Sequence, residues 1–507
     1  MRVSIAYPPL ENVKGVPLLG QNRQFQWFNS PTYIYPMVPA SCATLLQSKG
    51  YEVFWDDGIA EEKTYKDFTA EVMGRDLDVM MIETKAPVVR FHWEIIDEYK
   101  KMKPDMIIVV VGDHVTAFPE ETMNSCKADY VLTGGNYDFL MADLLDNLKA
   151  NDGKVKVSDL PKGIWYRREN AVEETAAGTD TQASADSIAS TGTFVLNQNL
   201  NDLPIIDRDL TKWKLYSEKN GNYSRTPGTY TMAARDCWHH RCTFCSWTTL
   251  YPQYLTRSPE SLLDEIGMLI DKYGVKEIMD DSGAFPIGTW LHTFCQGMIE
   301  RGYNKKVIMD CNMRLDALTY EEYRLMREAG FRFVLFGLES ANQETLDRID
   351  KRENIDKMIE SLKNAKKAGL SPHITLMFGY PWEDEKMVQN TVKLGRQILI
   401  KGWAHTLQAT VLIPYPGTPL YKECKENGWL LTEKYEDFDQ RMPVMKTPMG
   451  SEKIKEAVES VYKVSFNPEF LARRIAGIRS IDDVKFLFRA AGKVIGHLTD
   501  FGGKNGN

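Results

Sequence analysis

The stretch "ARDCWHHRCTFCSW", residues 234–247, places three of the chain's eight cysteines within nine positions. Cys237, Cys242 and Cys245 have the spacing C-x4-C-x2-C, and no fourth cysteine lies nearby. Thiolates grouped in this way predict a metal or iron–sulfur centre. The other cysteines are scattered and are expected to be buried core thiols: Cys42, Cys126, Cys295, Cys311 and Cys424.

Two kinds of centre must be compared for these three thiols. Structural zinc takes four ligands, usually as two spaced pairs, and the sequence has no second pair. His239 and His240 lie inside the loop, where the tight spacing disfavours a tetrahedral site. A 4Fe–4S cluster with three protein thiolates leaves one iron open to substrate chemistry. We favour the cluster; zinc and a loop without any metal are the alternatives.

Composition limits the classes of function. With 507 residues, of which 43% are hydrophobic, the chain is expected to form two or three domains. A net charge of -8 gives no electrostatic reason to bind nucleic acid. The start "MRVSIAYPPL" has no signal-peptide core, and no apolar run reaches membrane-spanning length. A cytoplasmic protein with reduced cysteines is therefore expected.

Residues 1–150 alternate short apolar runs with amphipathic segments, which predicts a doubly wound, Rossmann-like parallel sheet. Ligand loops are expected at the strand ends, in residues 112–121 and 133–139. Neither loop has the G-x-G-x-x-G spacing of a dinucleotide site. The five expected strands are "RVSIAYP", "YEVFWDD", "DVMMIET", "DMIIVVVG" and "ADYVLTGG".

The remaining chain divides into three parts. Residues 151–205 are expected to be a linker with a low-complexity insertion at 173–193, and residues 446–507 a helical C-terminal region. Between them, residues 206–445 show six strand-helix units, which predict a (β/α)6 partial TIM barrel. The cysteines directly follow its first strand. The expected strands are "GTYTMAA", "VKEIMDDSG", "KVIMDCN", "FRFVLFGLES", "HITLMFGYP" and "LQATVLIPYPG".

With an aromatic residue before the last cysteine ("CTFCSW"), the loop resembles that of the radical S-adenosylmethionine (SAM) superfamily. The N-terminal domain, "GLES", "FGYPWED" and "PYPGTPLY" are similar to its cobalamin-binding branch, which includes C-methyltransferases and the anaerobic cyclase of chlorophyll synthesis. The resemblance covers residues 1 to about 445. It implies that Cys237, Cys242 and Cys245 ligate a 4Fe–4S cluster, which cleaves SAM to a 5'-deoxyadenosyl radical. The usual family spacing is C-x3-C-x2-C, so one extra residue must bulge out of this loop.

A SAM pocket needs carboxylates, a cation and exposed backbone. Asp280, Asp281 and Ser282 follow the second barrel strand and could hold the amine, or merely cap a helix. Arg314 is a candidate for the SAM carboxylate, with an ordinary salt bridge as the alternative, and the resemblance places Glu339 against SAM. Further predicted contacts are Phe244, Asn312 and Ser340. Met377, Gly379 and Ile413 could pack the adenine, with a plain core role as the alternative.

The N-terminal domain lacks the D-x-H-x-x-G motif that supplies a histidine to cobalt. Asp113 and His114 are adjacent instead, so cobalamin is expected to bind without an axial histidine. His114 is a candidate contact at the strand end, with an ordinary surface histidine as the alternative. A domain that has lost cobalamin and serves substrate binding or docking is a further alternative.

The favoured function is cobalamin-dependent methyl transfer to an unactivated carbon. Radical cyclisation or rearrangement, and a non-catalytic iron–sulfur protein, are the alternatives. The expected partners are a small-molecule or lipid-like substrate and an external electron donor of flavodoxin or ferredoxin type. Residues 451–501 combine apolar stripes with basic flanks, which predicts either packing on the barrel or peripheral membrane contact. The sequence identifies neither the substrate nor the oligomeric state.

Overall fold

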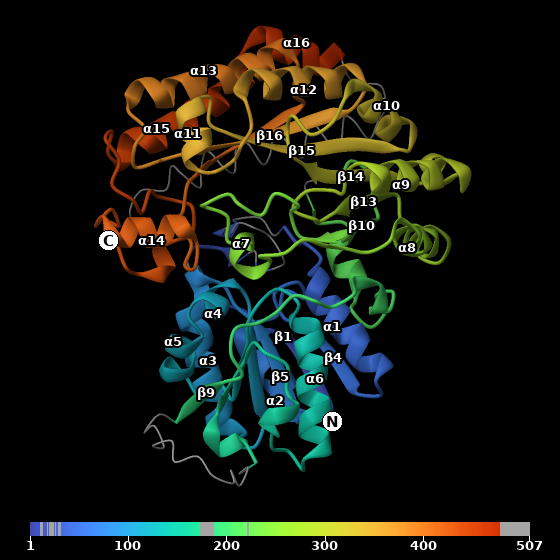
Figure 1. The fold of residues 1–507 in the computed structure, drawn as a ribbon, viewed down its shortest axis with the longest axis vertical. Coiled ribbons are helices and arrows are strands. Elements are labelled where there is room, and N and C mark those ends of the chain that lie inside the picture. The colour runs from blue at the N-terminus through green and yellow to red at the C-terminus, as the bar shows by residue number, and fades with distance from the viewer. Residues whose placement is uncertain are drawn as a thin grey trace.

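The structure is a computed structural model that describes residues 1–10, 14–17, 19, 25, 27–28, 32–172, 187–220 and 223–476. Two separate, mainly parallel sheets lie one above the other along the long axis of the molecule (Figure 1). The N-terminal sheet is blue to teal, and the second sheet is green to orange.

The first sheet has the strand order β4-β1-β5-β6-β7-β8-β9. Its first five strands are parallel and follow the chain order 2-1-3-4-5 of a doubly wound fold. Each was expected from its apolar run, and all five are confirmed. The bounds are β1 (Arg2–Tyr7), β4 (Glu52–Asp57), β5 (Val79–Glu83), β6 (Ile107–Val111), β7 (Tyr130–Leu132), β8 (Ile164–Arg167) and β9 (Ile188–Ser190).

The last two strands at one side of this sheet, β8 and β9, were not expected. β8 and β9 pair antiparallel and come from the segment interpreted as a linker. They are short, with three or four residues each, so they give little periodicity to detect. Residues 173–186 of the low-complexity insertion lie outside the described residues.

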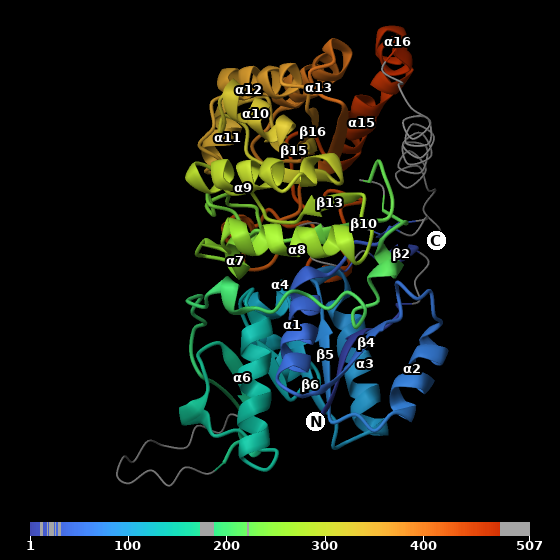
Figure 2. The ribbon, with the colours of Figure 1, turned by 90° about the vertical axis from the view of Figure 1, so that its right-hand side faces the viewer.

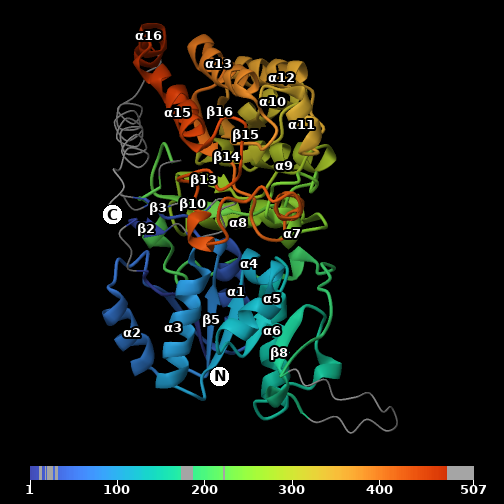
Figure 3. The same ribbon diagram turned by 90° about the vertical axis from the view of Figure 1, so that its left-hand side faces the viewer.

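Helices cover both faces of the first sheet (Figures 2 and 3). β6 reads Ile-Ile-Val-Val-Val, the continuous apolar run of a strand enclosed on both sides. α2 begins where the Thr64 side chain accepts a hydrogen bond from the Asp67 amide. The bounds are α1 (Met37–Ser48), α2 (Tyr65–Gly74), α3 (Val89–Met102), α4 (Asp113–Ala117), α5 (Pro119–Ser125) and α6 (Tyr137–Ala150).

The second sheet has the order β10-β13-β14-β15-β16-β17, with every neighbouring pair parallel. Strand order therefore equals chain order, which confirms the six-stranded partial barrel. The strands are β10 (Gly228–Thr231), β13 (Glu277–Asp280), β14 (Ile308–Met313), β15 (Phe331–Glu339), β16 (Ser371–Phe378) and β17 (Thr406–Val411).

A helix follows each of the first five barrel strands, and side-chain caps mark several starts. Ser258 caps α8 just before a proline, and Thr319 and Glu322 form a capping box at α10. The bounds are α8 (Pro259–Asp271), α9 (Thr289–Glu300), α10 (Tyr320–Glu328), α11 (Gln343–Arg348), α12 (Ile355–Lys367) and α13 (Glu385–Lys401).

The C-terminal helices cover the last barrel strand. The Tyr462 hydroxyl accepts a hydrogen bond from the Ala409 amide at 2.9 Å and donates one to its carbonyl at 3.1 Å. These bonds satisfy backbone groups of edge strand β17. The remaining elements are β2 (Val16–Pro17), β3 (Trp27–Phe28), β11 (Ala234–Arg235), β12 (Leu255–Thr256), α7 (Trp247–Leu250), α14 (Pro419–Glu426), α15 (Ser451–Tyr462) and α16 (Pro468–Ala476).

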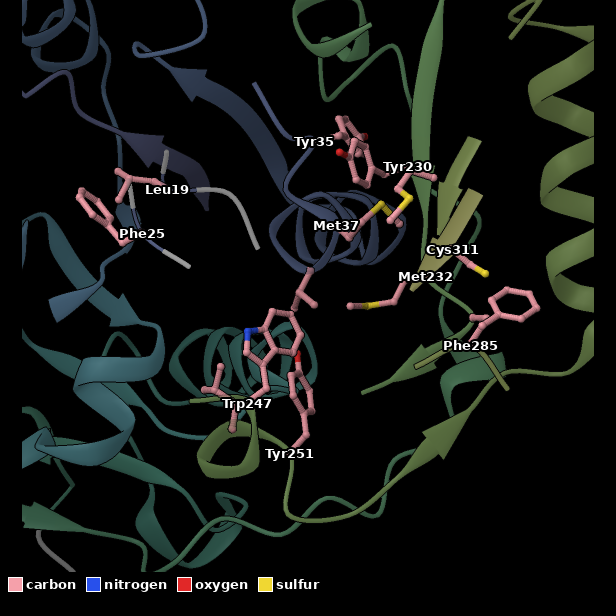
Figure 4. Close-up of a cluster of buried hydrophobic side chains, with 14 of the residues drawn as sticks. Leu19, Phe25, Tyr35, Met37, Tyr230, Met232, Trp247, Tyr251, Phe285 and Cys311 are labelled. Atoms are coloured by element: carbon pink, nitrogen blue, oxygen red, sulfur yellow. The ribbon is translucent and has the colours of Figure 1, made fainter. Parts of the chain in front are cut away.

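One cluster of buried side chains runs through both sheets. In Figure 4, Met37 of α1 lies near Met232, which follows β10, while Trp247 and Tyr251 lie below them. The Trp247 and Tyr251 rings stack with centroids 5.3 Å apart. The N-terminal sheet and the barrel therefore meet through a packed apolar interface rather than through a linker alone.

Candidate active site around the cysteine loop

The three grouped cysteines lie between β11 and α7, in residues 236–246, which we call the cysteine loop. All three side chains are partly exposed, whereas the five scattered cysteines are buried, as expected. None of the eight is joined to another in a disulfide. The grouped thiols are therefore the accessible ones, which fits ligands better than core residues.

One side of the cysteine loop is attached to residues 349–350, which follow α11. The Thr243 amide donates to the Ile349 carbonyl at 3.0 Å, and His239 Nε2 lies 2.7 Å from the Asp350 carbonyl oxygen. Burial, with Arg314 nearby, lowers the pKa of His239 to about 4, so this imidazole is neutral at physiological pH. The ring nitrogen is engaged by the backbone, which leaves it poorly placed as a zinc ligand.

The extra residue of the spacing lies on the outer side of the loop. His240 is exposed and has a φ of 37°, a backbone conformation that turns the chain sharply. Arg241 beside it is exposed and pairs with Asp350 at 3.0 Å. The bulge expected from the C-x4-C spacing is therefore at His240.

The opposite side of the loop rests on the end of β13. Asp280 is fully buried and accepts hydrogen bonds from Thr231 Oγ1 at 3.0 Å and from the Ala233 amide at 2.9 Å. Ser282 donates to Asp280 from its amide at 3.1 Å and from its hydroxyl at 2.6 Å, and that hydroxyl accepts from the Ala234 amide at 2.8 Å. Burial nevertheless raises the pKa of Asp280 to about 6.

These contacts define what the β13 end does in the structure. Asp280 and Ser282 brace the strand that leads into the cysteine loop, so their polar groups are already used. The Asp281 amide donates to the Thr231 carbonyl at 2.8 Å, and its side chain is almost fully buried. Asn312 extends the brace, because its Nδ2 donates to the Ser282 carbonyl at 2.8 Å.

A buried charge network lies at the ends of β14 and β15. Lys351 Nζ is 3.3 Å from Glu339 Oε1 and 3.4 Å from Glu353 Oε2, and Arg314 Nη2 is 3.3 Å from Glu353 Oε1. The Arg314 guanidinium lies over the Trp238 ring of the cysteine loop, 5.2 Å from its centroid. Each of the four charged side chains is less than one tenth exposed.

This network acts directly on a cysteine. Burial raises the pKa of the Cys242 thiol to about 11, while the charges of Lys351 and Arg314 oppose that rise. Glu339 has a φ of 67°, which is unusual for a side chain other than glycine. The structure therefore brings Arg314 and Glu339 close to Cys242, and their role as SAM contacts stays a prediction.

The other predicted contacts are more dispersed. Ser340 donates from its hydroxyl to Glu383 Oε1 at 2.7 Å, so it is engaged by the segment before α13 rather than by the charge network. Met377 and Ile413 are buried, Phe244 is half-buried against the core, and Gly379 turns the chain at a φ of 98°. Their roles at a cofactor stay predictions.

His114 is enclosed rather than exposed. Its ring centroid lies 4.5 Å from that of Tyr435, 5.7 Å from Phe118 and 6.1 Å from Trp93. Nε2 is 3.6 Å from Glu121 Oε2. The surface alternative for this histidine is therefore not what the structure has, because α4 turns the side chain into an aromatic cage.

Sequence reasoning missed Lys351, Glu353 and Tyr380. The two charged residues lie in "IDKREN" (349–354), which reads as an ordinary solvated turn because charge runs are usually exposed. Tyr380 lies in the quoted "FGYP", and its fully buried hydroxyl has no hydrogen-bond partner in the described structure. Only the three-dimensional arrangement relates these residues to the cysteine loop.

The residues present fit a cluster and SAM. Polar atoms around the loop are buried without a hydrogen-bond partner among the described residues: Trp238 Nε1, Tyr254 OH, Arg314 Nε and Tyr380 OH. Such atoms are expected where a polar ligand binds. Within the described ranges, no three His, Cys, Asp or Glu side chains surround one metal ion. A four-iron cluster does not require that, because each thiolate binds a different iron.

Comparison with known proteins assigns the class. Residues 234–395 match the family model "Radical SAM superfamily". The chain thus carries a radical SAM domain, which implies a 4Fe–4S cluster and SAM, and the enzyme class expected from the cysteine loop is confirmed.

Among the relatives, one is named as a methyltransferase and another as a cyclase, the two activities considered above. An uncharacterised methyltransferase of Pyrococcus horikoshii is 26% identical over 450 residues, covering 87% of this chain and 90% of the relative. An anaerobic magnesium-protoporphyrin IX monomethyl ester cyclase of Cereibacter sphaeroides is 20% identical, covering 80% of this chain and 62% of the relative.

Solved structures match the whole two-sheet arrangement. The radical SAM methyltransferase TsrM from Kitasatospora setae, with cobalamin and a [4Fe-4S] cluster bound, has a TM-score of 0.64 at 14% identity and covers 88% of this chain and 82% of its own. The cobalamin-dependent radical enzyme OxsB gives a TM-score of 0.67 at 13% identity, covering 99% and 72%. At these identities the likeness shows the fold. None of the described helices is long and apolar enough to cross a membrane.

Proposed function

We propose that this radical SAM enzyme transfers a methyl group to an unactivated carbon and depends on cobalamin to do so. The methyltransferase relative and the fold shared with TsrM and OxsB support this proposal. The proposed division of the chain is residues 1–150 for cobalamin, 151–205 as a connection that also adds β8 and β9 to the first sheet, 206–445 for cluster and SAM, and 446–507 as the C-terminal region.

One observation carries the proposal: the carboxyl edge of the first sheet touches the end of α7, the helix that directly follows the cysteine loop. The Gly135 amide, after β7, donates to the Leu250 carbonyl at 2.9 Å, and the Tyr251 hydroxyl donates to the Gly135 carbonyl at 3.0 Å. α4 and α7 lie side by side at this junction (Figure 1). Doubly wound sheets bind ligands at this edge, where the strand order reverses, here between β1 and β5. A ligand there would face the radical SAM domain.

A small cavity with a mixed polar and apolar lining lies beside this edge. This cavity, at the ends of β1 and β4, is bounded by the polar side chains of Tyr7, Asp57 and Tyr216 and by apolar residues. The Asp57 carboxylate accepts from the Tyr216 hydroxyl at 2.6 Å. The caged position of His114 supports binding without a protein histidine on cobalt.

Each cofactor would be held by its own set of residues. Cys237, Cys242 and Cys245 would ligate the cluster, and the charge network of Arg314, Glu339, Lys351 and Glu353 would bind the charged end of SAM. When bound, the cluster and SAM supply a carbon radical that abstracts hydrogen from substrate. The chain's own residues then orient the cofactors, neutralise charge and exclude water.

The relatives named as cyclases favour a second candidate, radical cyclisation or rearrangement without net methyl transfer. Product analysis separates the two. Anaerobically reconstituted protein should contain cobalamin and, with substrate and reductant, form both 5'-deoxyadenosine and S-adenosylhomocysteine. Formation of 5'-deoxyadenosine without S-adenosylhomocysteine would favour the second candidate, and a protein that binds no cobalamin would contradict the first.

Other partners are also proposals. We infer a cytoplasmic protein with an external one-electron donor of flavodoxin or ferredoxin type and a small-molecule or lipid-like substrate. Residues 477–501 of the basic, apolar C-terminal segment that could contact a membrane lie outside the described residues, and within residues 451–476 Phe466 and Leu471 are exposed. Sedimentation with anionic liposomes at low salt, lost on deletion of residues 465–507, would support membrane contact. Equal sedimentation of both proteins would contradict it.

A further inference from the structure

A buried ion pair joins the first sheet to the start of the cysteine loop. Arg235 precedes Cys237 by two residues, and Asp138 lies in the first turn of α6. Nη1 of Arg235 is 2.8 Å from Asp138 Oδ1, and Nη2 is 2.6 Å from Oδ2. Nη1 also donates to Asn136 Oδ1 at 3.1 Å. A two-pronged pair of this kind fixes direction as well as distance.

The environment of this pair allows little movement. The two charged side chains are 4% and 0% exposed. A Cβ atom placed on Gly135 would lie 2.0 Å from the Tyr251 ring, so the loop before α6 and the segment after α7 are in close contact. Because packed interfaces deform little, a displacement of the first turn of α6 would move the chain at Arg235 as well.

The same turn is linked to the crevice between β1 and β5. Tyr137, next to Asp138, donates from its hydroxyl to Glu83 Oε1 at 3.3 Å, and Tyr7 donates to the other carboxylate oxygen. Glu83 ends β5 and Tyr7 ends β1, so both lie where the strand order reverses. A continuous chain of contacts therefore runs from the ligand crevice of the first sheet to the cysteine loop.

We infer that Arg235 is a positioning residue, which orients the cysteine loop against the first sheet and makes the cluster respond to a ligand in the β1/β5 crevice. The orienting part requires only the radical SAM domain. The response to a ligand rests on the proposed function, with cobalamin as that ligand.

The test uses the full-length protein, reconstituted anaerobically with iron and sulfide, and records iron content and the electron paramagnetic resonance spectrum of the reduced cluster. Arg235→Lys keeps the charge but not the two-pronged geometry. It should retain iron, change the cluster spectrum and slow SAM cleavage at saturating SAM by roughly 10- to 100-fold, as small misplacements do. The matched control is Arg208→Lys. Arg208 forms an equally buried ion pair with Glu265, with the two side chains 2.8 Å apart, and this pair lies away from the cysteine loop. It should keep the wild-type spectrum.

Tyr137→Phe tests the response to ligand, since it removes only the hydroxyl that reaches Glu83. Hydroxocobalamin should alter the cluster spectrum of the wild type but not that of Tyr137→Phe. An equal response in both proteins would overturn the ligand part of the inference. Failure of the wild type to bind cobalamin would contradict the proposed function and the ligand part together, but not the role of Arg235, which is measured without cobalamin.

A wild-type spectrum and cleavage rate in iron-replete Arg235→Lys would overturn the positioning role. If Arg235→Lys does not fold, Asn136→Ala decides the matter, because it removes one hydrogen bond to Arg235 and leaves the ion pair. A smaller change in the same spectrum would support the inference, and an unchanged spectrum would overturn it.

Discussion

The two supports of the cysteine loop are built differently. At the end of β13, Asp280 accepts four hydrogen bonds and has no capacity left for a ligand. On the other side, between α11 and α12, both oxygens of Glu353 are buried without a hydrogen bond among the described residues, and ion pairs with Lys351 and Arg314 compensate the charge. Buried carboxylates beside the cysteine loop can therefore either brace the loop or wait for a ligand, and hydrogen-bond satisfaction distinguishes the two roles.

The largest effect is expected from changes in the cysteine loop itself, which both supports contact. Changing any of Cys237, Cys242 or Cys245 to Ala should remove most reconstituted iron and abolish 5'-deoxyadenosine formation, because each thiolate supplies one cluster ligand. Cys295→Ala and Cys424→Ala alter buried core thiols and should change neither quantity. Full iron occupancy in Cys242→Ala would exclude the cluster assignment. The comparison of the two supports of the loop would then lose its basis.

The next largest effect is expected from a change in the buried charge network. Lys351→Met leaves Glu339 and Glu353 in the interior without their shared cation, which should lower the free energy of unfolding by about 3–5 kcal/mol. It should also raise the KM for SAM. Urea denaturation and SAM-cleavage kinetics measure the two effects.

The matched control is an exposed ion pair between α11 and α14. Arg348 and Glu423 lie 2.8 Å apart but are 39% and 37% exposed, so Arg348→Met should cost less than about 1 kcal/mol. Equal losses in the two variants would mean that burial does not distinguish the charge network from an ordinary surface pair.

The sequence predicted the strands of both sheets well. The five parallel strands of the first sheet and all six of the barrel are continuous or alternating apolar runs, a signal that local composition carries. β8 and β9 escaped detection because three or four residues show no period. Parallel strands also predict that strand-end residues share one edge, and Arg314 and Glu339 do meet beside Cys242.

The rest of the site depends on contacts that spacing cannot show. Asp280 and Arg314 look alike as polar residues at the end of a strand, yet one is saturated by two backbone amides and two hydroxyls and the other pairs with Glu353. His114 follows a strand as a ligand would, but the Tyr435 ring that encloses it is far away in sequence. Lys351 lies in a charged turn that reads as solvated. The direction of each side chain, which the order of strands and helices does not give, decides whether such a residue braces the loop, lies in the core or can reach a ligand.

Asp280, the hydrogen-bonded support at the end of β13, should make the stability of the protein depend on pH. Burial raises the pKa of Asp280 to about 6, above the usual value of 3.8, so the folded protein holds this proton more tightly than the unfolded chain. Its stabilising contribution is therefore present below about pH 4 and is lost as pH rises through about 6, by roughly 3 kcal/mol in total.

Asp280→Asn removes this titration. The variant should be less stable than the wild type, because an amide cannot accept all four hydrogen bonds, but its stability should vary less between pH 4.5 and 7.5. Urea midpoints of the metal-free protein across that range measure the difference in slope. Parallel profiles of variant and wild type would contradict the raised pKa.

The smallest expected effect tests the outer side of the loop. His240 is exposed at a φ of 37°, and no ion pair or hydrogen bond of its side chain is found among the described contacts, whereas Cys242 two residues later lies beside the charge network. Glycine adopts positive φ without strain but loses more entropy on folding, so His240→Gly should change stability by less than about 1 kcal/mol in either direction. Iron content and SAM cleavage should match the wild type. A marked loss of iron would mean that the extra residue of the C-x4-C spacing shapes the cluster site itself, and that the bulge is a working part of the loop rather than an insertion it tolerates.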